Sequence, residues 1–183
     1  VPALIDTLDD ESEMTRRHAA CALSAVGEPA VDALTEALTR ANPTARAAAA
    51  AILGDIGLIA APATAALIEA SKDPEPGVRC HACDALGTAV QDSPVAVPAL
   101  TAALADQNAD VRVAATFSLC RLGPHAAEAV GALAGVLDDD NRYVRADALH
   151  AMKRIGTPEA TDILIEHLMA ARWCPITTRD SQF

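Results

Sequence analysis

The chain has 183 residues, enough for one ordinary domain or a short repeat array. Its 14 basic and 25 acidic residues give a formal net charge of -11, which argues against the basic surface of a general nucleic-acid binder. Hydrophobic residues make up 51% of the chain but aromatic residues only 2%, so closely packed, slim aliphatic helices must form the core.

In chain order, the sequence alternates between short apolar segments and longer helical segments. The short segments share a leucine position and lie at 1–8, 30–38, 62–70, 97–104, 129–137 and 160–168. The longer segments lie at 15–27, 45–57, 78–90, 111–123 and 144–156, each with an arginine in second place: Arg16, Arg46, Arg79, Arg112 and Arg145. Successive arginines are 30, 33, 33 and 33 residues apart, which is the spacing of a helical repeat array.

Residues at the ends of the longer segments predict where each helix begins and ends. Short polar residues that cap helix N-termini precede four of the five segments: Ser12, Asn42, Asn108 and Asn141. Pro43 and Pro76 stand at the first helical position, where a missing N–H costs nothing. Four segments end in a glycine that we expect in the left-handed conformation: Gly27, Gly57, Gly123 and Gly156.

We therefore predict an all-α fold, an α-solenoid of about five stacked antiparallel helix pairs plus a terminal helix. In each pair the shorter helix lies outside and the longer one inside, and neighbouring pairs complete a core that one pair cannot bury alone. The solenoid is expected to span residues 1–171. Residues 172–183 are expected to form a C-terminal cap or tail, in which Trp173 covers the last core and Pro175 stops the helix.

Residues 47–70 are nearly uncharged and about long enough to cross a bilayer. However, Asp55 would lie in the middle of such a span, and Gly54, Gly57 and Pro62 interrupt it. The repeat register also passes straight through this stretch. We therefore expect two repeat helices here and no membrane partner.

The repeated pattern L(x)DxxxxVRxxAAxALGxIG resembles HEAT repeats, most closely the short HEAT-like type of phycobilisome lyases, over roughly residues 1 to 171. The resemblance implies a ladder between repeats, in which the five arginines named above contact aspartates of the turns. The matching aspartates are Asp10, Asp73, Asp106 and Asp139. Arg40 stands in the aspartate position of the second repeat, so we expect the ladder to be broken or rearranged there.

The segment VRCHACDALG (78–87) concentrates potential metal ligands within a few positions. At about 100° per residue, Cys80, His81 and Asp84 face away from the apolar stripe of this helix, while Cys83 lies to one side as a small buried filler. The neighbouring inner helices offer alanines, Val113 and Phe117 rather than further ligands. We therefore expect no metal site and no other cofactor.

The positions opposite the apolar stripe of the inner helices lie on the concave surface of the solenoid, where such proteins bind partners. The predicted lining of this surface is Arg17, His18, Cys21, Ala47, Ala51, Asp55, Cys80, His81, Asp84, Thr88, Val113, Phe117, Arg121, Asp147, His150 and Arg154. Small side chains beside the aromatic Phe117 suit an extended peptide or a helix. Two alternatives stay open: Phe117 packs between repeats, and Arg121 and Arg154 only complement helix dipoles in last turns.

These features predict a non-catalytic scaffold that binds a protein or peptide through its concave face. The family resemblance implies one alternative, a bilin-lyase-like subunit that handles a tetrapyrrole chromophore. The His-Glu pairs of HEAT-like deoxyhypusine hydroxylases are missing, because every histidine precedes alanine or leucine. Catalysis by a cysteine would need a base within reach and a lowered thiol pKa. Five cysteines without paired spacing are typical of reduced thiols in a cytoplasmic protein.

Overall fold

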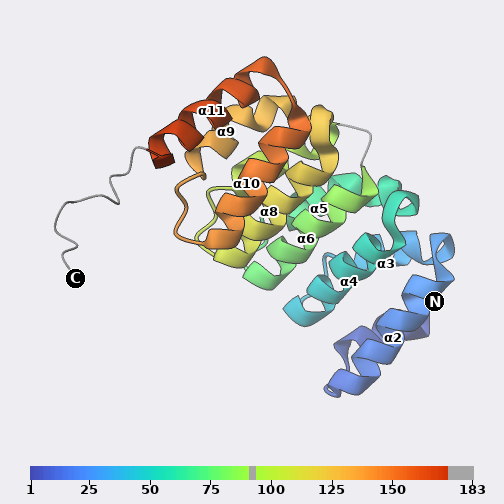
Figure 1. The fold of residues 1–183 in the computed structure, drawn as a ribbon. Coiled ribbons are helices and arrows are strands. Elements are labelled where there is room, and N and C mark those ends of the chain that lie inside the picture. Colours follow the sequence, from blue (N-terminus) through green and yellow to red (C-terminus); the bar gives the residue numbers. More distant parts are fainter. Residues whose placement is uncertain (91–93, 173–183) are drawn as a thin grey trace, which may run out of the picture.

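Two layers of helices stack side by side in the computed structural model, which describes residues 1–90 and 94–172 (Figure 1). The inner layer contains the 14-residue helices α2 (Glu13–Val26), α4 (Pro43–Ile56), α6 (Pro76–Ala89), α8 (Ala109–Leu122) and α10 (Arg142–Ile155). The outer layer contains α1 (Pro2–Asp6), α3 (Val31–Ala37), α5 (Thr64–Ala70), α7 (Val97–Ala103), α9 (Val130–Gly135) and α11 (Pro158–Arg172). The predicted all-α solenoid of helix pairs with a terminal helix is confirmed.

Four of the inner helices begin directly after the predicted capping residues. The side chains of Ser12, Asn42, Asn108 and Asn141 each accept a hydrogen bond from a backbone N–H in the first helical turn. Glu75 precedes α6 without such a side-chain bond, and Pro76 follows it at the start of the helix. The caps satisfy N–H groups that have no partner within the helix, so they define its first residue.

Short 3₁₀ segments connect the first four inner helices to the outer helices that follow them: η2 (Glu28–Ala30), η3 (Gly57–Ala63), η4 (Pro94–Ala96) and η5 (Gly123–Ala129). A further one, η1 (Thr7–Asp9), follows α1. The expected left-handed helical conformation is found at Gly156 (φ 68°, ψ 17°). It is wrong for Gly57 (φ 70°, ψ -135°), because the chain there leaves the helix directly into η3. Gly27 and Gly123 resemble Gly57, and the positive φ still favours glycine.

The apolar stretch Pro43–Ala70 is long and apolar enough to cross a membrane by length and composition alone. In the structure, Gly57 and η3 divide it into the inner helix α4 and the outer helix α5. Ile52 and Leu53 of α4 and Leu67 of α5 are at most 1% exposed. This stretch therefore supplies one helix pair of the stack.

The shared leucine position of the outer helices forms the centre of the core. Leu34, Leu67, Leu100 and Leu133 are fully buried, whereas Leu4 and Leu164 at the two ends of the stack are only half-buried. Burial in this position therefore requires a neighbouring pair on both sides, as expected for a solenoid.

Aspartates and arginines link the repeats in a ladder of three bidentate ion pairs. Arginine Nε and aspartate Oδ2 are separated by 2.8 Å in Arg46–Asp73, 2.7 Å in Arg79–Asp106 and 2.8 Å in Arg112–Asp139. The second guanidinium nitrogen, Nη2, donates to Oδ1 of the same carboxylate, and Nη1 donates to carbonyl oxygens in the turn of its own repeat. Each rung thus joins two adjacent turns through charge-assisted hydrogen bonds.

The ladder ends where arginine replaces aspartate. Arg40 points back toward the first pair and bonds to Asp6 and Asp9, so in the part of the chain that the structure describes Arg16 donates only to the carbonyl oxygens of Asp10 and Glu11. The Asp10 carboxylate accepts the N–H of Ser12 within its own turn. At the other end, position 172 is also an arginine, and within the described residues Arg145 donates only to the carbonyl oxygens of Asp139 and Asp140.

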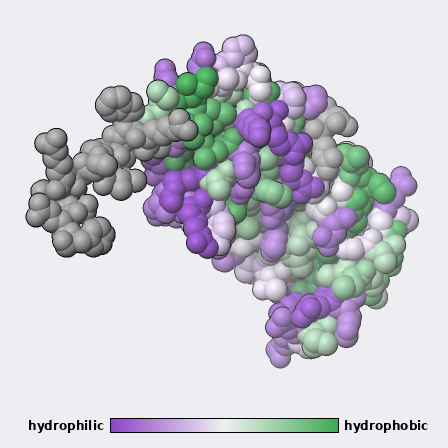
Figure 2. Space-filling model, viewed as in Figure 1, coloured by the Kyte–Doolittle hydropathy of each residue, from purple (hydrophilic) through white to green (hydrophobic). Residues whose placement is uncertain are grey.

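The C-terminal end of the stack exposes apolar side chains. Ile165, Leu168 and Met169 on α11 are 55%, 55% and 50% exposed. Figure 2 shows an apolar patch at the upper left, over α9 and α11. The predicted roles of Trp173 and Pro175 fall outside the described residues.

A candidate binding groove on the inner helices

Two adjoining hollows lie on the side of the inner helices that faces away from the outer helices. The C-terminal hollow, of about 290 Å³, is lined by residues of α6, α8 and α10: Cys80, Asp84, Asp110, Val113, Ala114, Phe117 and Asp147. The N-terminal hollow, of about 280 Å³, is lined by residues of α4, α6 and α8: Ala51, Gly54, Asp55, His81, Asp84, Ala85, Thr88 and Arg121. Asp84 borders both hollows, which together form what we call the inner groove.

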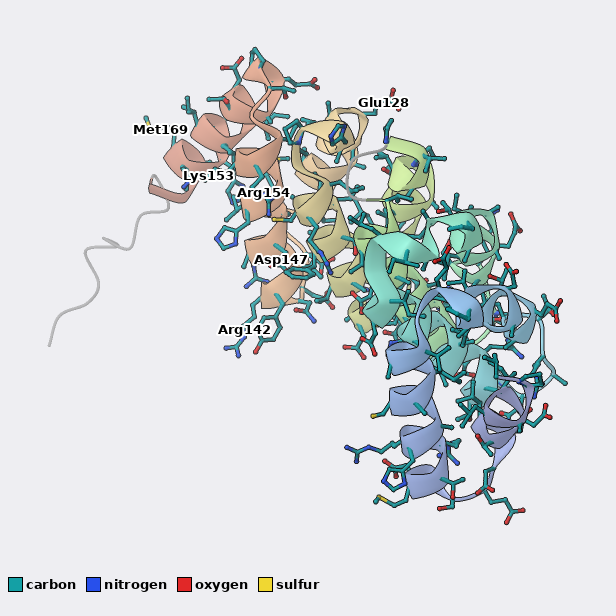
Figure 3. All side chains as sticks on the ribbon, turned by 90° about the vertical axis from the view of Figure 1, so that its right-hand side faces the viewer. Glu128, Arg142, Asp147, Lys153, Arg154 and Met169 are labelled. Carbon is teal, nitrogen blue, oxygen red and sulfur yellow. The ribbon has the colours of Figure 1, made fainter. Side chains whose placement is uncertain are left out.

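The inner groove includes more than half of the residues that the sequence assigned to the concave surface. It is lined by Ala51, Asp55, Cys80, His81, Asp84, Thr88, Val113, Phe117, Arg121 and Asp147. His150 and Arg154 are exposed on α10 but line neither hollow. Figure 3 shows Asp147 near the middle of α10 and Arg154 closer to its C-terminal end.

Arg17, His18 and Cys21 on α2 are exposed but also line neither hollow. The reason is a looser contact between α2 and α4. Ala50, Cys83 and Thr116 face the next inner helix and are fully buried, whereas Ala20 in the same position stays half-buried. The connection between α2 and α3 has 4 residues (27–30), whereas those between α4 and α5 (57–63) and between α8 and α9 (123–129) have 7, so α2 joins its outer helix differently.

Phe117 lies on the surface of the groove rather than in the core between repeats. Its side chain is 47% exposed. The guanidinium carbon of Arg121, one turn further along α8, lies 5.8 Å from the centre of the ring. This distance permits a cation–π interaction, so Arg121 does more here than complement the helix dipole.

No direct ion pair neutralises the carboxylates of the C-terminal hollow: among the described residues, Asp84, Asp110 and Asp147 form none. Burial raises the pKa of Asp84, although His81 and Arg121 oppose the effect. Burial likewise raises the pKa of Asp147, opposed by His150.

Asp110 joins this set although the sequence did not single it out. It stands in the first turn of α8, and residues 110, 113, 114 and 117 follow helical spacing along one face. That spacing is a signal in the sequence that would have identified Asp110. Asp110 of the neighbouring helix α8 and Asp147 of α10 border the same hollow as Asp84.

Burial disfavours the reactive thiolate form of the cysteines near the groove. Cys80 lies on the predicted side of α6, but α8 packs beside it, and its Sγ lies 3.7 Å from the carbonyl oxygen of Asp110. Burial, with Asp84 and Asp110 nearby, raises the pKa of Cys80 to about 11. Burial also raises the pKa of Cys83 to about 12. Nucleophilic cysteines require the opposite shift. Within the described part of the chain, no three His, Cys, Asp or Glu side chains are placed to hold a metal ion.

Comparison with protein families matches HEAT repeats over residues 1–54, 31–120 and 97–173. The chain belongs to the HEAT-repeat family. Comparison of this HEAT-repeat chain with the curated proteins finds no match.

Solved structures share the HEAT-repeat solenoid. The complex of CpcE and CpcF of phycocyanin lyase from Nostoc sp. PCC7120 contains a chain with 27% identity and a TM-score of 0.72, covering 82% of this chain and 96% of that one. A designed armadillo repeat protein in complex with the peptide (KR)4 has 18% identity and a TM-score of 0.67, covering 93% and 88%. Computationally designed armadillo repeat proteins for modular peptide recognition have 18% identity and a TM-score of 0.63, covering 90% of this chain and 87% of that one. The two designed proteins are similar in fold alone.

Proposed function

We propose that this HEAT-repeat protein is a non-catalytic scaffold that binds a protein or peptide through the inner groove. The observation that carries the proposal is the position of Phe117, a half-exposed aromatic ring that lines the C-terminal hollow. Ala114 in the same hollow and Ala85 in the adjoining N-terminal hollow provide a buried floor of small side chains. Exposed aromatic rings beside such a floor are typical anchors for an extended segment or a helix.

Affinity capture from the source lysate tests this proposal with a matched control. The Phe117→Ala/Arg121→Glu variant removes the ring and inverts the charge above it. The control, Tyr143→Ala/Arg142→Glu, makes the same change at a second exposed aromatic ring, where the arginine lies 4.7 Å from the centre. Tyr143 and Arg142 line neither hollow. Proteins lost only by the Phe117 variant would support binding in the groove, whereas equal capture by both variants would contradict it.

A bilin-lyase-like subunit is the second candidate function. It is supported by the 27% identity to a chain of the CpcE–CpcF complex over 82% of this chain. If the protein handles a tetrapyrrole, adding a free bilin to the purified chain should shift the visible absorption band, and the Phe117→Ala variant should shift it less. A spectrum equal to the sum of the two separate spectra would remove this candidate and leave the scaffold function.

A further inference from the structure

We propose that the segment bound in the inner groove is basic, and that one of its lysine or arginine side chains enters the C-terminal hollow. The aliphatic stem would lie along Phe117 and Val113, and the cation would lie between Asp84 and Asp147. This inference rests on the proposed scaffold function and specifies the chemistry of the partner.

Charge complementarity identifies the partner. The lining of the C-terminal hollow includes three carboxylates, Asp84, Asp110 and Asp147, and no cationic side chain. They come from three different helices, and none forms an ion pair within the described residues. Asp84 and Asp147 are half-buried, and partly buried carboxylates without an ion-pair partner are costly, so an incoming cation would offset that cost. The chain's net charge of -11 would also speed the approach of a basic segment.

The walls of the hollow fit the stem of a long basic side chain. Val113, Ala114 and Phe117 provide an apolar wall on α8, while the carboxylates border the same space from α6, α8 and α10. Lysine and arginine carry an apolar stem and a charged end, so both parts find a matching surface here. The exposed ring of Phe117 adds a face for a cation–π contact.

The two hollows differ in charge, which sets the register of the bound segment. In the N-terminal hollow, Arg121 lies on the same surface as Asp55 and Asp84. A second cation would meet Arg121 there, so the basic residue is expected in the C-terminal hollow only. Anionic partners are disfavoured, because the same carboxylates would repel them.

Fluorescence anisotropy with defined peptides tests the inference. The probes are three labelled peptides of about twelve residues, long enough to cross the groove: alternating lysine and alanine, and the analogues with norleucine or glutamate in place of lysine. The lysine peptide should bind most tightly. Asp84→Asn/Asp147→Asn should weaken its binding by about tenfold or more, since both changes remove carboxylates from the hollow.

The control variant is Asp32→Asn/Asp162→Asn, which changes the net charge equally. Asp32 and Asp162 are exposed on the outer helices α3 and α11. This variant should keep the affinity within about twofold, because long-range attraction is screened at physiological salt. Equal weakening by both double variants would mean non-specific attraction and would overturn the inference. Tighter binding of the norleucine peptide would overturn it as well.

Stability measurements separate lost binding from lost folding. Because burial raises the pKa of Asp84, ionisation costs more in the folded state, so Asp84→Asn should raise the unfolding temperature at pH 7. The gain should vanish near pH 3, where the carboxyl is protonated in both states. Weaker peptide binding by a more stable variant therefore reports on the hollow. A variant that unfolds earlier and loses binding would assign Asp84 a structural role and overturn the inference.

The variants distinguish a partner that is not basic from a protein that does not act as a scaffold. If captured partners depend on Phe117 but not on Asp84 and Asp147, the groove binds a partner that is not basic. If neither partners nor peptides depend on Phe117, the scaffold function fails too.

Discussion

Aspartates take opposite roles in the ladder and in the groove. The Asp106 carboxylate accepts from the Arg79 guanidinium and from the backbone N–H of Asn108, and these bonds lower its pKa despite partial burial. Among the residues that the structure describes, no such donor bonds to the Asp84 carboxylate, and burial raises its pKa. The same side chain thus stabilises the fold where hydrogen bonds match its charge, and leaves charge available for a partner where they do not.

Asp106→Asn should destabilise the protein at pH 7 by about 1–3 kcal/mol, because charge-assisted hydrogen bonds across the rung are lost. The folded pKa of Asp106 is lowered, so its contribution is present above the ordinary pKa of about 4 and is lost as pH falls through the folded value. Chemical denaturation at pH 7 and near pH 2 would measure how much unfolding free energy the variant loses at each pH. The exposed turn residue Asp138 supplies the control, Asp138→Asn. An equal deficit for Asp106→Asn at both pH values would contradict the prediction.

Small residues let the inner helices approach closely. A Cβ atom on Gly87 of α6 would lie only 2.9 Å from the Cα of Ser118 on α8. The buried Ser118 hydroxyl donates to the carbonyl oxygen of Cys83 at 2.9 Å, which ties the two helices together. Because Cys80 and Asp84 lie on the same helix, this spacing also decides how deeply they sit beside α8.

Gly87→Ala should destabilise the protein by about 1–3 kcal/mol, since the added methyl group forces α6 and α8 apart. Gly131→Ala is the matched control, because a Cβ atom there meets nothing within 4 Å. Alanine is the better helix former, so this control should gain up to about 1 kcal/mol. Urea unfolding midpoints would compare the two variants. Equal changes of the same sign would show that helix spacing is not limiting.

Contacts between neighbouring repeats are most extensive in the middle of the stack. The three ladder rungs join the turns that begin α4, α6, α8 and α10, while Arg16 has no aspartate partner in the next repeat. Ala20 on α2 is half-buried where the matching residues are fully buried. In a solenoid, stability is a sum of local and nearest-neighbour contributions, so the first pair has the least support. The inner groove lies entirely on the well-supported helices.

Hydrogen exchange should therefore be faster in α2 than in α6 and α8, by at least about tenfold. The looser α2–α4 contact allows the first pair to open without the rest of the stack. Exchange followed by mass spectrometry, with peptides covering each inner helix, would measure the difference. Uniform protection along α2, α6 and α8 would contradict it and would indicate a single cooperative unit.

Local patterns in the sequence were enough to determine the repeat, the helix starts and the buried leucine position. Asn108 caps α8 and Leu100 is fully buried as predicted, because caps and helical periodicity depend on nearby residues only. The same reasoning placed Asp84, Phe117 and Arg121 on one side of the inner helices.

Only the tertiary structure decided which of these residues form a groove. The half-burial of Cys80 and Asp84, the place of Asp110 beside them and the separation of α2 depend on how closely neighbouring helices pack. That distance is set by contacts such as Gly87 against Ser118, between residues on different helices. A helical wheel describes one helix in isolation and contains no information about the helix beside it.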